Sequence, residues 1–403
     1  MASSDSWPDL RHERAREAAA RRLPPWRVGL ATAAAYSQLA VHLALALPLW
    51  ALVPATRPSA KYSLRQALLV TVVRYISALT MRLRIAPAID APVAPASLQR
   101  SALLRPDVPP VAAERVVGLV RQAAVRVGVR PQAVRAYVFG GATGTTCAPD
   151  ELRSLRRIVL ALHGGAWVVG RAHEERGGSA TAVTLAPLLS ADVRVLNVEY
   201  RLAEENPFPA ALLDALSAYV WLVEELQISP DRIVLSGDSG GANVALALIH
   251  YLRETELLPL PGRLLLASPA VDRTGSHSGP PGSRGDLLTP NDLAWALEAY
   301  LGYGRHPADL IQSPYVSPAS KRNLSELEQA SGSWPRTLIC IGETEGYQPA
   351  QRALQEALAR WQPQQVEPLL EVQGAPHCSC LIPTFFEPHT GTARQAMAAF
   401  VEA

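Results

Sequence analysis

An alternation of apolar runs and helical stretches constrains the fold of this chain more than any other feature of the sequence. After residue 130, apolar and β-branched residues gather in six short runs: Arg157–Leu162, Val193–Tyr200, Arg232–Ser236, Arg263–Ala267, Thr337–Ile341 and Val366–Val372. Stretches with a helical pattern separate several of these runs, at Ala210–Leu226, Gly241–Glu256 and Tyr347–Trp361, and a further helix is expected at Val111–Val127. Strands that alternate with helices predict an α/β fold with a mostly parallel central sheet flanked by helices.

The composition and net charge indicate which kind of molecule the protein acts on. Hydrophobic residues make up 48% of the 403 residues, and the formal net charge is only +2. A chain this close to neutral gives no case for a nucleic-acid partner, so we expect chemistry on a small apolar molecule.

The four cysteines, Cys147, Cys340, Cys378 and Cys380, form no CxxC pair. They are too few for a disulfide framework and lack a second Cys/His cluster for zinc. We expect reduced, buried thiols, although one bridge stays open if the domain lies in an oxidising lumen. No metal is expected.

The N-terminal region begins with a polar, arginine-rich stretch, residues 1–27, that predicts a flexible tail or a short helix. An apolar run follows at Val28–Val53, longer than the roughly 20 residues that span a bilayer. It lies too far from the start and is too long for a standard cleaved signal peptide. Two interpretations stay open: a transmembrane or monotopic anchor, and a hydrophobic helix packed over the catalytic part.

Arginines outnumber other charges before this run. If the run spans a membrane, this bias predicts that the N-terminus lies in the cytosol and the catalytic part in a lumen, such as that of the endoplasmic reticulum. The sequon Asn323-Leu324-Ser325 would then be accessible for glycosylation.

Residues 63–85 place apolar side chains at helical spacing with four arginines among them, which predicts an amphipathic basic helix on a membrane surface or over the substrate entrance. The proline-rich residues 86–110 are typical of a linker. The expected organisation is a tail with an anchor over 1–60, the amphipathic helix and linker over 61–110, and a catalytic domain over 111–403.

The strongest chemical motif is Gly237-Asp238-Ser239-Gly240-Gly241, which follows an apolar strand and opens a helical run. G-x-S-x-G in this setting predicts a strained strand-to-helix turn that exposes a nucleophilic serine, Ser239. A second motif, His163-Gly164-Gly165-Ala166-Trp167, follows the first predicted strand, where glycines let backbone N–H groups turn toward an oxyanion.

These motifs resemble those of the hormone-sensitive lipase family of esterases. His163–Trp167 resembles its H-G-G-G-W segment, and Gly237–Asn243 resembles its G-D-S-A-G-G-N turn. Two further blocks are similar, Glu199–Ala203 with Asn206–Ala210, and Ser313–Pro318. The resemblance covers about residues 110–403 and implies an α/β-hydrolase fold with a helical cap, here roughly residues 272–318. The N-terminal extension looks more like that of arylacetamide deacetylases and fungal esterases.

The resemblance implies an oxyanion hole drawn from Gly164, Gly165, Ala166 and Gly240. Ala166 stands where the third glycine is expected, so a positive φ there would be strained. Gly240, where alanine is commoner, still offers its N–H.

The remaining members of a triad must follow the serine as an acid and then a histidine. By position in the family pattern, Glu345 is the expected acid, with Glu343 as its rival, and His377 is the expected histidine, with His389 as the alternative.

These residues predict a serine carboxylester hydrolase that needs no cofactor, acting on a small ester, with acetyl suggested by analogy with the deacetylases. An acyltransferase on the same triad and a non-catalytic binding module on the same fold stay open as alternatives. Four cap residues are candidates either for lining the pocket or for plain packing within the cap, namely Trp295, Tyr300, Leu301 and Tyr303. The sequence leaves the oligomeric state undetermined.

Overall fold

The computed structural model describes residues 7–85, 93–174, 179–277, 284–288, 293–329, 331–381 and 386–403. The described residues form a nine-stranded sheet in the order β3-β1-β2-β5-β4-β6-β7-β8-β9. Strands β4 to β9 are parallel to one another, whereas β2 is antiparallel to both β1 and β5. The predicted α/β class with a mostly parallel sheet is therefore confirmed.

The six predicted strands are present, with bounds at β4 Arg157–Leu162, β5 Val193–Val198, β6 Ile233–Asp238, β7 Arg263–Ala267, β8 Arg336–Gly342 and β9 Leu370–Val372. The last strand is shorter than expected, because Val366 makes only an isolated bridge to Thr337. Three further strands were not predicted: β1 Ser101–Leu104, β2 Ala136–Phe139 and β3 Thr146–Cys147. Strand β1 lies inside the segment expected to be a linker, whose residues 86–92 fall outside the described part of the chain.

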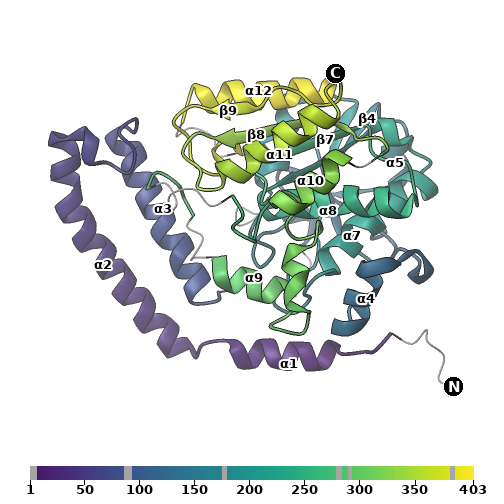
Figure 1. Ribbon diagram of the computed structural model, residues 1–403, viewed down its shortest axis with the longest axis horizontal. Helices are drawn as coiled ribbons and strands as arrows, with labels where there is room; N and C mark the ends of the chain where they lie inside the picture. The colour runs from purple at the N-terminus through teal and green to yellow at the C-terminus, as the bar shows by residue number, and fades with distance from the viewer. Residues whose placement is uncertain are drawn as a thin grey trace.

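Strand side chains alternate between two separate cores, as a two-faced sheet requires. In β4, Ile158, Leu160 and Leu162 belong to one core, and Val159 and Ala161 belong to the other. The first core is covered by α4 Gly118–Val127, α7 Ala210–Val220, α8 Gly240–Thr255, α9 Ala294–Tyr300, α10 Lys321–Gln329 and α11 Gln348–Trp361. The second is covered by α6 Ala180–Leu185 and α12 His389–Glu402, and the short α5 Pro149–Arg153 lies before β4. Helices thus cover both faces of the sheet (Figure 1).

The helix expected at Val111–Val127 is shorter than predicted. A 3₁₀ turn occupies Ala113–Arg115, and α4 begins only at Gly118, whose φ is +60°. Helix α7 continues past Val220 as a π-helical turn over Trp221–Glu225, which completes the predicted helical stretch.

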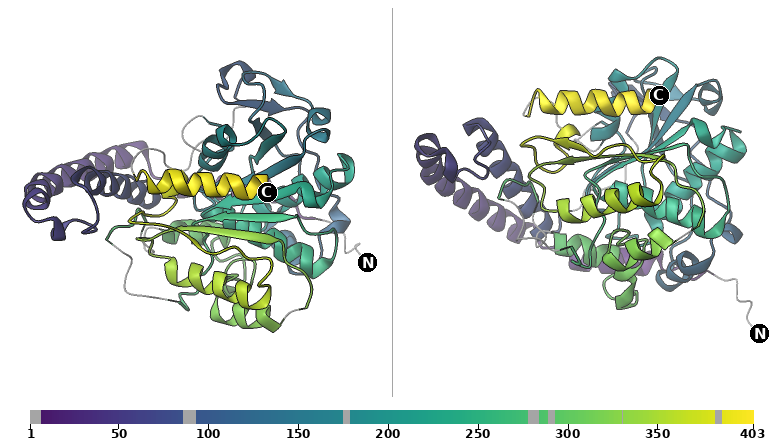
Figure 2. Two further views of the ribbon diagram at one scale, coloured as in Figure 1. Left: turned by 90° about the horizontal axis from the view of Figure 1, so that it is seen from above. Right: turned by 45° about the horizontal axis from the view of Figure 1, so that its top comes forward.

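Three helices precede the sheet: α1 Arg11–Arg21, α2 Pro25–Leu52 and α3 Leu64–Arg82. Helices α2 and α3 lie side by side and project from one end of the body (Figures 1 and 2). We call α2, α3 and the turn between them, residues 25–82, the hairpin. A capping box starts α3, in which Ser63 Oγ accepts from the Gln66 N–H and Gln66 Oε1 accepts from the Ser63 N–H.

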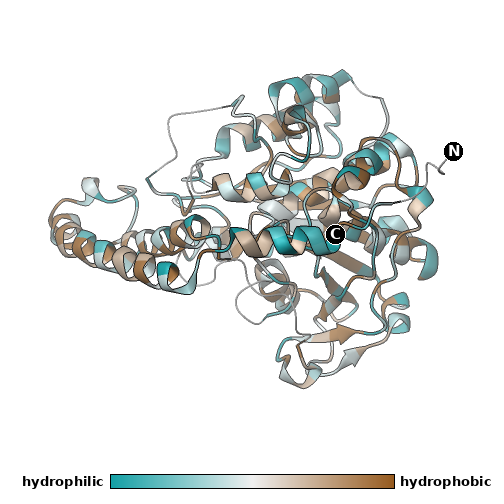
Figure 3. Cartoon of the chain, turned by 90° about the horizontal axis from the view of Figure 1, so that it is seen from below, coloured by the Kyte–Doolittle hydropathy of each residue, from teal (hydrophilic) through white to brown (hydrophobic). Residues whose placement is uncertain are grey.

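Both hairpin helices are long and apolar enough to cross a membrane by length and composition. Helix α2 packs on α3, and its buried side chains are Leu39, Ala46 and Trp50, of which Ala46 and Trp50 belong to the second core. The outer face is open, with Leu45 at 74% and Leu52 at 81% exposure. Hydrophobic residues, coloured brown, make up much of the projecting helices in Figure 3.

Helix α1 is docked on the body rather than flexible. The guanidinium of Arg14, 5% exposed, donates to the carbonyls of Val127, Gly128 and Glu205. Residues before and after α2 therefore contact the same body. This arrangement does not support the expected topology, with the N-terminus in the cytosol and the catalytic part in a lumen, and the compartment stays a prediction.

Candidate active site

Ser239 stands on a sharp turn between β6 and α8. Its φ of +50° and ψ of −116° are strained for a residue with a side chain. Neighbouring positions leave no room: a Cβ on Gly241 would lie 2.2 Å from the Leu162 carbonyl oxygen, and one on Gly237 would lie 2.6 Å from the Ala242 nitrogen. The spacing of glycines around Ser239 is therefore a direct requirement of this turn.

The structure brings the predicted serine, histidine and acid together at the carboxyl ends of β6, β8 and β9. His377 Nε2 lies 2.8 Å from Ser239 Oγ, and His377 Nδ1 lies 3.1 Å from Glu345 Oε2. Three donors fix the Glu345 carboxylate: the Ser268 hydroxyl at 2.5 Å, the Gly342 N–H at 2.5 Å and the Gln351 amide at 2.9 Å. No sequence motif indicates Ser268 or Gln351 as site residues, although Ser268 directly follows β7 at the same edge of the sheet.

Burial and hydrogen bonding set the charges in this group. Burial alone would raise the pKa of Glu345, but bonds from His377, Ser268 and Gln351 outweigh it and lower the pKa. Burial would lower the pKa of His377, but its neighbours Cys378 and Glu345 outweigh burial and raise the pKa well above the ordinary value. The arrangement therefore favours a carboxylate beside an imidazole that gains a proton readily.

The two rival residues lie elsewhere. Glu343 forms an ion pair with Lys61 and accepts from the Gly374 N–H at 2.6 Å, so its carboxylate is engaged away from His377. His389 is exposed at the first turn of α12.

The Gly-rich turn after β4 lies against the start of α8. A Cβ added to Gly240 would lie 3.2 Å from the Ala166 nitrogen, so the two backbones approach closely beside Ser239. Gly165 has a φ of +117°, and a Cβ there would lie 2.1 Å from the Val169 carbonyl oxygen, which makes glycine obligatory. Among the described residues, none accepts a hydrogen bond from the N–H of Gly165 or Ala166.

Gly164 differs from its neighbours in this turn. Burial raises the pKa of Asp238 to about 6, while the Thr181 hydroxyl and the Gly164 N–H act in the opposite direction by bonding to its carboxylate. The Gly164 amide is therefore directed at Asp238, unlike the free amides that follow it.

Ala166 adopts the strained geometry that its position implies, with a φ of +52°, and Trp167 follows at +64°. Stacking holds both ends of the turn: Trp167 lies on Tyr300 at 4.4 Å between ring centroids, and His163 lies on Tyr200 at 4.1 Å. Tyr200 also donates its hydroxyl to the His163 carbonyl at 2.6 Å. These aromatic contacts maintain two successive non-glycine residues at positive φ.

A pocket of about 510 Å³ opens over Ser239 and His377. One wall is α3, through Ile76, Ser77, Thr80 and Met81, and the cap contributes Leu288 and Leu293. Residues 63–85 were expected to lie on a membrane or to cover the substrate entrance, and they line the pocket. The predicted cap lining was wrong: Tyr300 stacks on Trp167, and Trp295 and Tyr303 bond to Glu204. Cap residues 278–283 and 289–292 lie outside the described residues.

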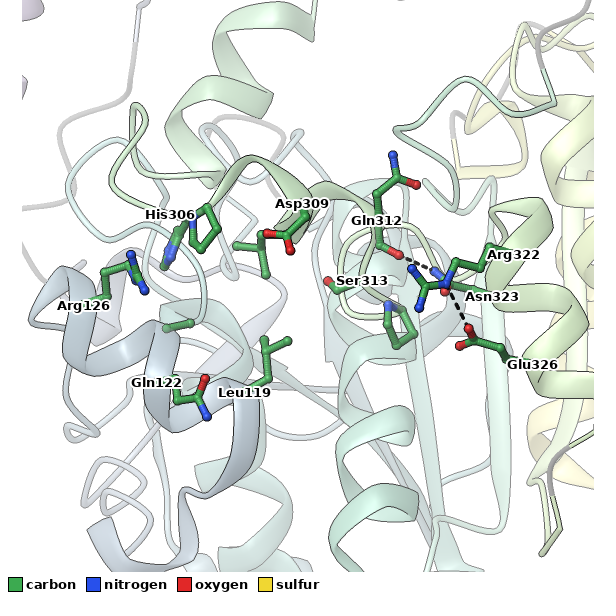
Figure 4. A pocket seen from close by; sticks show the side chains of 14 residues that line it. Leu119, Gln122, Arg126, His306, Asp309, Gln312, Ser313, Arg322, Asn323 and Glu326 are labelled. Carbon is green, nitrogen blue, oxygen red and sulfur yellow. Dashed lines mark hydrogen bonds and ion pairs between the residues drawn. The ribbon is translucent and has the colours of Figure 1, made fainter.

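A second pocket, of about 410 Å³, lies between α4 and α10, and neither Ser239 nor His377 lines it (Figure 4). Asn323, the sequon residue, is at its edge and is only 5% exposed. Its amide nitrogen donates to the Gln312 carbonyl at 2.9 Å and to the Ser317 carbonyl at 2.8 Å. The atom that would carry a glycan is buried and engaged, so the sequon is not accessible as predicted, and the structure does not support glycosylation at Asn323.

A family profile described as alpha/beta hydrolase fold matches residues 159–381, a stretch that contains Ser239, Glu345 and the Gly-rich turn. The chain belongs to this family. Solved relatives include a hormone-sensitive lipase from a metagenome library, with 26% identity, a TM-score of 0.53 and coverage of 67% of this chain and 81% of that one. Esterase E25 is 27% identical with a TM-score of 0.50 over 66% and 74% of the two chains. The predicted resemblance to the hormone-sensitive lipase family is therefore confirmed.

Curated relatives of this α/β hydrolase include an acetyl-hydrolase from Streptomyces hygroscopicus, which is 34% identical over 216 residues. That match covers 52% of this chain and 66% of the relative. The carboxylic ester hydrolase LipN of Mycobacterium tuberculosis is 33% identical over 182 residues, 43% of this chain and 46% of LipN. The chain thus spans about half to two thirds of the length of these relatives.

Proposed function

We propose that this protein is a serine carboxylester hydrolase in which Ser239, His377 and Glu345 form the catalytic triad. The observation that carries the proposal is the hydrogen-bonded chain from Ser239 Oγ through the His377 ring to Glu345, beside the amides of Gly165, Ala166 and Gly240. The relatives named as acetyl-hydrolase and carboxylic ester hydrolase support the same chemistry.

In the first half of the reaction, Ser239 Oγ bonds to the ester carbonyl carbon while His377 Nε2 takes the hydroxyl proton. The carbonyl electron pair moves to oxygen, and the backbone N–H groups of Gly165, Ala166 and Gly240 stabilise the resulting oxyanion. We leave Gly164 out of this set because its amide is directed at Asp238. Glu345 holds the imidazole with its Nδ1 proton toward the carboxylate and stabilises the charged ring.

In the second half, the tetrahedral adduct collapses, the carbon–oxygen bond to the alcohol breaks, and His377 returns the proton to the departing alcohol oxygen. Water then attacks the acyl-enzyme, with His377 again taking the proton. Release of the carboxylic acid restores the Ser239 hydroxyl, so each turnover uses one water and needs no cofactor.

The substrate in this proposal is a small apolar ester with a short acyl group such as acetyl. The pocket of about 510 Å³ suits a small molecule, and its α3 wall is lined mainly by apolar and small polar side chains. The relative named as an acetyl-hydrolase favours a short acyl chain.

We further propose that the chain associates with a membrane through residues 28–53, lying on the surface rather than spanning the bilayer. Seven large apolar side chains of α2 are exposed at 48% or more, namely Trp26, Leu30, Tyr36, Val41, Leu45, Leu49 and Leu52. An unpaired apolar face of this length fits a helix that lies in the plane of the lipid headgroups. The body, including the docked α1, would remain on one side.

In terms of organisation, we propose a membrane-contacting N-terminal segment over residues 1–60, α3 with its connection to the sheet over 61–110, and a catalytic domain over 111–403 to which β1 also contributes a strand. The cap at residues 272–318 closes one side of the pocket through Leu288 and Leu293.

The test is hydrolysis of p-nitrophenyl acetate by the full-length protein and by its Ser239→Ala variant. We expect the substitution to reduce kcat on the order of 10⁴-fold or more, because the nucleophile is removed while the fold is kept. Turnover by Ser239→Ala at the wild-type rate would exclude Ser239 as the nucleophile. An added acceptor alcohol distinguishes the alternative, since an acyltransferase would yield a new ester instead of free acid.

A further inference from the structure

Asp286 is a fully buried carboxylate that belongs to the cap yet touches both loops that carry His377 and Glu345. Its Oδ1 accepts from the His377 backbone N–H at 2.9 Å and from the Leu287 N–H at 2.7 Å. Its Oδ2 accepts from the N–H of Gly346, next to Glu345, at 2.8 Å. One side chain, 0% exposed, therefore fixes the main chain of two triad segments that lie 31 residues apart in sequence, residues 346 and 377.

The residue before Asp286 is held by the hairpin. The Gly285 carbonyl accepts from the Tyr62 hydroxyl at 2.6 Å and from the Thr344 hydroxyl at 3.1 Å, and the two hydroxyls lie 2.8 Å apart. Tyr62 is 2% exposed and comes from the turn between α2 and α3. In α3, Arg74 donates to the Arg284 carbonyl at 3.1 Å.

The hairpin turn is itself held in shape. The Arg57 guanidinium donates to the Tyr62 carbonyl at 2.7 Å and to the Trp50 carbonyl at 3.0 Å, which links the turn to the end of α2. The Tyr62 ring packs on Phe386 at 5.6 Å between centroids, and the adjacent Lys61 pairs with Glu343. A continuous set of contacts thus runs from α2 to the triad loops.

We propose that Asp286 is a positioning residue for His377 and Glu345, and that Tyr62 of the hairpin turn is the residue through which the N-terminal hairpin supports it. The hairpin is then part of the support of the active site as well as the surface that faces lipid. This proposal rests on the proposed function, since it concerns the efficiency of the same triad.

Charge supports this role alongside geometry. Among the described residues, five titratable side chains face His377: the carboxylates of Glu345, Asp286 and Asp238, the Cys378 thiol, and Tyr347, whose ring packs edge-on at 6.1 Å between centroids. Burial raises the pKa of Asp286, while the nearby His377 acts in the opposite direction. An ionised Asp286 stabilises the imidazolium that forms during catalysis, so its removal lowers the pKa of His377.

The experiment compares full-length Asp286→Asn with wild type on p-nitrophenyl acetate across pH. Asparagine keeps Oδ1 but places an N–H₂ group against the Gly346 N–H, so the Gly346 contact and the charge are both lost. We expect kcat to fall roughly 10- to 100-fold with KM changed less than about 2-fold, and the acidic limb of kcat/KM to move to lower pH. An unchanged kcat, or an unmoved acidic limb, overturns the assignment of Asp286.

Tyr62→Phe tests the hairpin contact in a variant that keeps the buried ring and so preserves packing. We expect kcat to fall roughly 3- to 10-fold, since one buried hydroxyl donor is lost. Tyr36→Phe is the matched control, because Tyr36 is 54% exposed on α2 of the same hairpin. Equal kcat for the two variants overturns the role of Tyr62.

A double variant, Tyr62→Phe with Asp286→Asn, shows whether the two residues act together. If Tyr62 acts through Asp286, the double variant loses less than the product of the two single effects. Multiplicative losses overturn that connection. Ser239→Ala, measured in parallel, separates this proposal from the proposed function: persistent turnover in Ser239→Ala invalidates the triad itself, whereas unaffected Asp286 and Tyr62 variants invalidate only the support.

Discussion

The turn around Ser239 and the outer face of α2 are opposite extremes of this molecule. Around Ser239, a single added carbon atom would meet backbone at Gly237, Gly241 and Gly165 at 2.1 to 2.6 Å. On α2, a Cβ added to Gly29 would meet nothing within 4 Å, and large apolar side chains are open. Geometry decides which residues are possible in the first region, whereas only the surrounding medium constrains them in the second.

The largest effect is expected where the backbone is tightest. Gly241→Ala places a carbon 2.2 Å from the Leu162 carbonyl oxygen, so the backbone of the turn around Ser239 must shift or the protein must unfold locally. We expect a loss of about 4 kcal/mol or more in the free energy of unfolding, measured by urea denaturation, together with loss of esterase activity. Gly29→Ala in α2 is the matched control, and we expect a gain of about 0.5–1 kcal/mol there. Equal effects at both glycines would contradict the comparison.

The next effect concerns the medium around α2. Leu45→Lys puts a charge on the face that we expect to lie in lipid, and we expect vesicle binding in a flotation assay to fall on the order of 100-fold. Hydrolysis of a soluble ester is expected to stay within about 2-fold, because Leu45 is 74% exposed and does not line the pocket over Ser239. Val125→Lys, an exposed apolar position on α4 of the body, is the control. Unchanged vesicle binding of Leu45→Lys would contradict the proposal that the exposed face of α2 lies on a membrane.

A pH profile separates the two regions without any substitution. The histidine must be neutral to take the serine proton, and its pKa is raised well above 6.5, so activity is lost as pH falls through that raised value. We expect the midpoint of the acidic limb of kcat/KM above pH 6.5, with about a 10-fold loss for each further pH unit. Vesicle binding through the uncharged face of α2 should not change over the same range. A midpoint below 6.5 would show that burial prevails over the neighbours of His377.

The smallest effect is expected at Ala166, in the Gly-rich turn after β4, where the backbone is already strained. Ala166→Gly removes the conformational cost of a φ of +52°, which is about 1–2 kcal/mol. Glycine also raises the conformational entropy of the unfolded chain, which destabilises the folded state by about 0.4–1 kcal/mol. We therefore expect a change in unfolding free energy within about 1 kcal/mol and activity within about 2-fold. Ala166→Val is the contrast, because a β-branched residue suits this φ less well and should destabilise the protein. A large gain of activity in Ala166→Gly would mean that the strain limits the oxyanion hole.

Much of the sheet could be predicted from the hydrophobic pattern of the sequence, because buried parallel strands are continuous apolar runs. Strands β4 and β7 match their predicted bounds residue for residue, and the turn that carries Ser239 lies at Gly237–Gly241, as predicted. Strands β1 and β3 were not predicted, because they have only four and two residues and lie among prolines, glycines and polar residues. Short strands at one end of the sheet take their geometry from their neighbours rather than from their own sequence.

The site was predictable where the chemistry requires a fixed order along the chain, and not where contacts link distant segments. Ser239 and His377 could be selected because each follows a strand, and Glu345 could be preferred to Glu343, which follows the same strand, by its position in the family pattern. Nothing near Asp286 or Tyr62 indicates that they meet the triad loops, since Tyr62 lies 223 residues from the Gly285 carbonyl it bonds. The direction of the Gly164 amide could not be predicted from the sequence either, because it depends on the side chain of Asp238.

Helix α3 alone separates the pocket over Ser239 from α2. This position has a practical consequence for handling the protein. A micelle that covers the outer face of α2 also brings detergent monomers to Ile76, which is 44% exposed and lines the pocket. Detergents with a single flexible alkyl chain should therefore act as competitive inhibitors, and bulky rigid amphiphiles that cannot enter the pocket should extract the protein with its turnover intact.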